Sequence, residues 1–238
     1  MGRPIAPRPM TAMSLMRRTL SVNRLRRFTM PCEYHHVEPA ETVRGGVVVT
    51  AEVGMTEDVR HVFRMDNEVL AFRFTATVSD RAGTAPRERL TDPARLKMWL
   101  RAAGLDATDV SPADLRDAVE LREVIYRIGS AIAAREQPDP KDVRTLNTVA
   151  AAGHAKAALE RDLARWRLTG TTPVADALGV LATDAIHVLG GPGRGRVKNC
   201  EGPGCAGLFL DTSRGANRRW CSMNTCGNRV KKARLAES

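Results

Sequence analysis

The stretch that decides the fold of the C-terminal part is CEGPGCAGLFLDTSRGANRRWCSMNTC, which runs from Cys200 to Cys226. Its cysteines are spaced C-x4-C-x15-C-x4-C, and residues that favour tight turns bridge each short pair. Two such pairs can place four sulfurs tetrahedrally around one Zn²⁺. The spacing therefore predicts a zinc site with four ligands: Cys200, Cys205, Cys221 and Cys226.

The expected zinc ion is structural, because four thiolates close the coordination sphere and leave no position for water or substrate. Few large apolar residues lie in this segment, so metal binding would supply most of its folding free energy. The alternatives are two disulfides or free thiols. The chain shows no secretory signal, so we expect a cytoplasmic, reducing compartment, which favours metal.

The net charge of +10 is unevenly distributed along the chain. Residues 1–32 contain seven Arg and no acid, and residues 194–238 contain ten Lys and Arg against three Asp and Glu. A basic segment beside the cysteines favours contact with an anionic polymer such as DNA. The cations expected to contact DNA are Arg214, Arg218, Arg219, Arg229, Lys231, Lys232 and Arg234. A solvated charged face is the alternative for all of them, and a structural role beside the zinc site is a second one for Arg229.

Helix signals dominate residues 59–190. Asp92-Pro93 is a typical helix start, with Leu96, Trp99 and Leu100 on one face and Gly104 placed to end the helix. A capping box at Ser111–Asp114 opens a long helix that ends before Pro138. A third helix is predicted from Lys141 past Val149. A fourth is predicted from near Pro173, with Leu178, Leu181, Ala185 and Leu189 along it.

Two segments are ambiguous by periodicity. Glu68–Val78 alternates like a half-buried strand, although the spacing of Leu70, Phe74 and Val78 leaves a helix open. Leu163–Leu168 fits either a short strand or a helix end. The glycine-rich run 190–195 lacks the Gly-Lys-Ser/Thr of a phosphate-binding loop, so we interpret it as a linker.

Several features point away from other classes of protein. The sequence contains no run of 18 apolar residues, so we do not expect a membrane span. No Ser/His/Asp, paired-carboxylate or nucleotide signature stands out, so we do not expect an enzyme. Residues 1–54 form an unpatterned basic leader, which we expect to be either disordered or not native; a transit peptide is the alternative. It contains Cys32, His35 and His36, which we do not expect to bind metal, and the other histidines are scattered singly at His61, His154 and His187.

Leu208–Arg234, LFLDTSRGANRRWCSMNTCGNRVKKAR, resembles the CGNR-type zinc finger, named for the tetrapeptide found here at Cys226–Arg229. Glu88–Leu105 resembles the early part of the α-rich ABATE domain that accompanies such fingers. The resemblance implies a stress-induced transcription regulator. One departure lies in Leu70–Thr77, where Arg73 and Ala76 stand in place of the acidic residue and the Asn usual in the family.

We therefore predict a mainly α protein, α+β at most, with an ABATE-like helical domain over 59–190 and a small C-terminal zinc-binding module over 196–234. The expected function is that of a cytoplasmic, bacterial-type transcription regulator with one structural Zn²⁺. The zinc module would bind DNA, and the helical domain would sense an unknown signal or ligand, or form a homodimer. The rival interpretation is a zinc ribbon that binds proteins and does not touch DNA.

Overall fold

The structure, a computed structural model, describes residues 59, 61–160, 163–168 and 173–236. The leader expected over 1–54, with its Cys32, His35 and His36, lies outside these residues. The described helices are α2 (Leu70–Thr75), α3 (Pro93–Ala102), α4 (Pro112–Ala133), α5 (Pro140–Ala152), α6 (Pro173–Gly190) and α7 (Asn228–Ala236). The predicted mainly α fold is confirmed.

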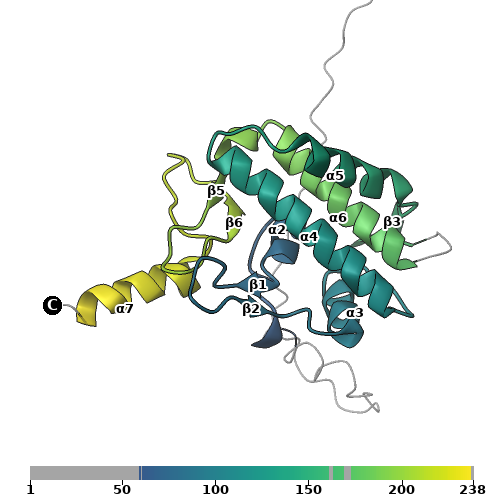
Figure 1. Cartoon of the computed structure of the whole chain (residues 1–238), viewed down its shortest axis with the longest axis horizontal. Coiled ribbons are helices and arrows are strands. Elements are labelled where there is room, and N and C mark those ends of the chain that lie inside the picture. Colours follow the sequence, from purple (N-terminus) through teal and green to yellow (C-terminus); the bar gives the residue numbers. More distant parts are fainter. Residues whose placement is uncertain (1–58, 60, 161–162, 169–172, 237–238) are drawn as a thin grey trace, which may run out of the picture. The chain divides into compact units, whose positions relative to one another are not determined.

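Short strands complete the fold as three antiparallel pairs. These pairs are β1 (Val78–Ser79) with β2 (Arg87–Glu88), β3 (Lys156–Glu160) with β4 (Leu163–Arg167), and β5 (Val197–Asn199) with β6 (Leu208–Leu210). The ambiguous segment after residue 162 is thus a strand, in which Trp166 pairs with Ala157. Helices α4, α5 and α6 pack on one another, and α2 packs on α4 and α6 (Figure 1).

The predicted helix starts are confirmed by their caps. The Asp92 carboxylate accepts the Arg95 N–H at 2.9 Å, and Pro93 occupies the first turn of α3. At α4, Ser111 and Asp114 bond to each other's backbone N–H groups, which is the capping box expected from the sequence. The expected inward faces are buried as well, including Leu96, Trp99 and Leu100 of α3 and Leu178, Leu181, Ala185 and Leu189 of α6.

The strand interpretation of Glu68–Val78 is wrong, because most of this segment is the helix α2. Its buried residues are Ala71, Phe72, Phe74 and Thr75, a spacing that lies on one face of a helix. The alternation was misleading because Phe72 and Phe74 fit two patterns: the alternation of a strand and the buried face of the helix. Tertiary contacts decide the outcome: the Ala71 N–H donates to the Asp184 carboxylate of α6 at 2.8 Å, which ties the first turn of α2 to the core.

Helix α6 is long and apolar enough to cross a membrane by length and composition alone. More than half of it is buried inside the protein, as expected for the core helix of a folded domain. The glycine-rich run that follows is short and ordered. Arg194–Arg196 forms a 3-10 turn, and the Arg194 side chain donates to the Leu189 carbonyl at 2.9 Å. Val197 then enters the same core as α4 and α6.

Helix α6 approaches the end of α5 so closely that a side chain does not fit between them. A Cβ atom added to Gly179 would lie 2.6 Å from the Cα of Gly153. We expect Gly179→Ala to destabilise the fold by about 1–3 kcal/mol, because the backbone must move to accept the methyl group. Chemical denaturation measures the change. Gly190→Ala in the same helix is the matched control, since its added Cβ meets open space and stability should hold.

Candidate metal centre

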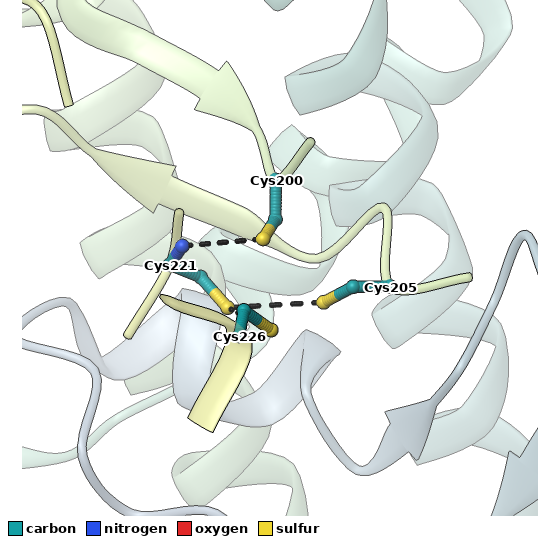
Figure 2. Close-up of side chains that lie close together, drawn as sticks. All are labelled: Cys200, Cys205, Cys221 and Cys226. Atoms are coloured by element: carbon teal, nitrogen blue, oxygen red, sulfur yellow. Dashed lines mark hydrogen bonds between the residues drawn. The ribbon is translucent and has the colours of Figure 1, made fainter. Parts of the chain in front are cut away.

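The four C-terminal cysteines gather at one buried point. Their Sγ atoms all lie within 4.8 Å of one another, with 3.8 Å between Cys205 and Cys221 and 3.7 Å between Cys221 and Cys226. Figure 2 shows the four side chains pointing toward a common centre. Sulfurs at about 2.3 Å from a tetrahedral zinc would be roughly 3.8 Å apart. The donor set and its spacing therefore fit one structural Zn²⁺.

The first cysteine pair is positioned by a turn in which glycine is required. Cys200 directly follows β5, and the Cys205 N–H bonds to the Gly202 carbonyl at 2.9 Å. A Cβ on Gly202 would lie 2.9 Å from the Cβ of Cys226, inside the sulfur cluster. Gly204 has a φ of 71°, which L side chains rarely adopt. The turn predicted from the Gly-Pro-Gly bridge is therefore what allows both sulfurs to face inward.

The second pair is presented by a single wide helical turn. Cys221 precedes the π-helical turn Met223–Gly227, and Cys226 lies within it. The backbone N–H of Cys221 donates to the Cys200 sulfur at 3.3 Å, and that of Gly202 donates to the same sulfur at 3.4 Å. Such donors stabilise a thiolate. The turn runs directly into α7, so the last cysteine lies two residues before that helix begins.

Without a cation the quartet cannot ionise completely. Hydrogen bonds from Cys200 and the other thiols lower the pKa of Cys205, whereas hydrogen bonding to Cys200 and Cys205 raises the pKa of Cys221. Neighbouring thiolates repel one another, so some of the four cysteines keep their protons when no cation is bound. A bound Zn²⁺ stabilises all four as thiolates. The chemistry of the cluster thus favours a metal over four separate thiols.

A buried carboxylate organises the 15-residue loop between the cysteine pairs. Asp211 is fully buried, and it accepts Lys198 Nζ at 2.6 Å and the Arg218 N–H at 2.9 Å. Burial opposes its charge, but these bonds and those from Ser213 hold the pKa of Asp211 well below its ordinary value. From the sequence, Asp211 was noted only as part of the segment that resembles the CGNR-type finger, and its role in the loop was missed. The Asp-Thr-Ser run was the available signal, since Asp side chains often bond to the backbone two residues on.

Three of the cations expected to contact DNA bond to other groups of the protein. Arg218 donates to the backbone carbonyls of Trp220 and Cys221, at 2.9 and 2.5 Å. Arg219 pairs with Glu201 at 2.5 Å. For Arg229, the structure favours a structural role beside the zinc site. Its guanidinium donates to two partners, the Asp80 carboxylate at 2.9 Å and the Pro203 carbonyl at 3.1 Å.

The other four cations are arranged differently. Their side chains are exposed, and they pair with no acid in the part of the chain that the structure describes. These residues are Arg214 in the loop and Lys231, Lys232 and Arg234 on α7. The expected set of seven thus divides into cations that bond to other groups of the protein and exposed cations that do not pair with an acid in the described residues.

The zinc module shares a core with the helical domain. Leu208 of β6 and Val197 of β5 belong to the main hydrophobic cluster. Leu208 packs on α4 where Gly129 leaves room, since a Cβ there would lie 2.5 Å from the leucine side chain. The Tyr126 hydroxyl donates to the Ala206 carbonyl at 3.1 Å. The cysteines themselves pack with Phe209 and Trp220 in a smaller cluster.

An enzyme in the helical domain would require a convergent polar pocket. The open hollow between α4 and α5 has a volume of about 430 Å³, and its Arg127 and Asp142 pair with each other at 2.6 Å. Three or more His, Cys, Asp or Glu side chains must lie close together to hold a metal ion. Among the described residues, the cysteine quartet forms such a group. His61, His154 and His187 are not part of it.

Two family matches cover most of the described chain. Residues 68–192 match ABATE, described as "Putative stress-induced transcription regulator", and residues 196–237 match the CGNR zinc finger. Both are regulatory or zinc-finger families and neither is an enzyme family. No curated protein matches the chain in sequence. Because the first match spans more than half of the residues, the chain belongs to the ABATE family, and it carries a CGNR zinc finger after that domain.

Proposed function

We propose that this regulatory zinc-binding protein binds DNA through the cations that its zinc module leaves unpaired. Cys200, Cys205, Cys221 and Cys226 would hold one structural Zn²⁺. The observation that carries the proposal is the division of the basic residues. Arg218, Arg219 and Arg229 bond to other groups of the protein, whereas four other exposed cations pair with no acid in the described part of the chain. A surplus of unpaired cations on a rigid support is typical of phosphate-contacting surfaces.

Helix α7 is the element best placed to meet a duplex. Lys231, Lys232 and Arg234 lie within its nine residues, and no residue of the helix is buried. It projects away from α4, α5 and α6 (Figure 1). Its first turn continues from the turn that holds Cys226, so zinc would fix where the helix begins. Less ordering then remains to be done on binding, which favours affinity.

The helical domain has a separate part in this proposal. Helices α2–α6 would sense a signal or form a homodimer, and a stress signal is the class that the family description names. The protein would work in the cytoplasm, where thiols stay reduced and available to zinc.

Removal of the metal tests the structural role of zinc. We expect a strong chelator to lower the melting temperature by roughly 10 °C or more, because structural zinc supplies much of the folding free energy of such modules. Circular dichroism during heating follows the change. The loss should extend to the helical signal, since Leu208 and Val197 belong to the main core. An unchanged melting curve after verified zinc removal would contradict the structural role.

Replacement of the α7 lysines tests the DNA surface. We expect the double variant Lys231→Ala, Lys232→Ala to bind a mixed-sequence duplex more weakly. The slope of log K against log salt should shrink by roughly 0.9 for each phosphate that the variant no longer neutralises. Gel-shift titration at several salt concentrations measures both. The melting temperature should stay the same, because both side chains are exposed.

Arg219→Ala is the matched control, because it also removes a cation from the module but one already paired with Glu201. Its DNA affinity and salt slope should stay close to those of the unmodified protein. Equal losses in both variants would argue for a diffuse charge effect and against α7. A zinc-loaded protein without affinity for DNA at low salt would favour the protein-binding alternative.

A further inference from the structure

One basic side chain from outside the zinc module reaches the metal-binding sulfurs. Both terminal nitrogens of Arg64 lie 3.6 Å from the Sγ of Cys221, although the two residues are 157 positions apart in the chain. One of these nitrogens also contacts the Asp66 carboxylate at 3.4 Å. The guanidinium is therefore directed at one particular sulfur of the quartet.

The segment that carries Arg64 is anchored on both sides. Phe63, directly before it, is buried in the main core. Asn67, shortly after it, donates from its side chain to the Leu208 carbonyl of β6 at 2.9 Å. The backbone carbonyl of Asn67 in turn accepts the Arg73 side chain. A side chain on an anchored segment loses less freedom when it makes a contact. Contact with Cys221 therefore costs the Arg64 side chain less conformational entropy than it would on a free segment.

Cys221 differs from Cys200 in the source of its hydrogen bonds. Cys200 receives two backbone N–H groups from within the module. Cys221 receives a guanidinium, which keeps its charge at any physiological pH and presents its donors in a fixed fork. Four thiolates around one Zn²⁺ carry a net charge of roughly −2. A cation beside them offsets part of that charge, and donors around a ligand strengthen metal binding.

We propose that Arg64 is an outer-sphere residue of the metal site, which bonds to the sulfur of Cys221 and slows the release of zinc. The inference rests on the proposed zinc-loaded quartet. Arg64 lies outside both matched regions, 68–192 and 196–237, so the contact comes from the segment that precedes the ABATE match. Through this contact the zinc site depends on the segment that leads into α2.

Zinc release from the full-length protein tests the proposal. We expect Arg64→Ala to pass its zinc to an excess of a chromophoric chelator about 10-fold faster than the unmodified protein, the lower end of the usual outer-sphere effect. Arg64→Lys keeps the charge and loses the fork, so its rate should be intermediate. Arg219→Ala removes a guanidinium that pairs with Glu201, and it should release zinc at the unmodified rate.

A second measurement covers the case in which Arg64→Ala does not fold. In the Co²⁺-substituted protein, Arg64→Lys should shift the thiolate-to-metal charge-transfer band, while Arg219→Ala should leave it in place. Release rates and spectra equal to those of the unmodified protein would overturn the role of Arg64 alone. Unmodified protein that binds no zinc would overturn this proposal together with the proposed function.

Discussion

Four sulfur atoms that lie within 4.8 Å of one another need a cation between them, and the C-terminal part of this protein is built around that need. The turn at Gly202, the π-helical turn that holds Cys226 and the backbone donors to Cys200 all direct sulfur toward the same point. Neighbouring thiolates repel one another when no metal is bound. The shape of the module and the direction of α7 therefore both depend on thiolate coordination.

The same dependence extends into the helical domain. Leu208 and Val197 place the β5–β6 pair in the main core, where Gly129 of α4 makes room for the leucine. Arg229 bonds to Asp80, in the connection between β1 and β2, and the Ala82 N–H bonds to the Gly204 carbonyl at 3.0 Å. Contacts of this kind make the zinc module an extension of the helical domain.

Local signals in the sequence predicted much of this structure. The cysteine spacing, the capping box at Ser111 and the start at Asp92-Pro93 each depend on neighbouring residues, and each is confirmed. What sequence reasoning missed depends on distant partners. Segment 68–78 forms a helix where its alternation favoured a strand, and Asp184 of α6 binds its first turn. The division of the cations was equally hidden, because Glu201, Asp80 and the carbonyls that engage them are visible only in three dimensions.

Zinc-edge X-ray absorption on the purified full-length protein, together with its metal content, tests thiolate coordination of zinc most directly. With thiolate coordination, the protein should contain one zinc per chain with four sulfur neighbours at about 2.3 Å. A protein without stoichiometric zinc, or a spectrum that requires nitrogen or oxygen ligands in place of sulfur, would contradict it.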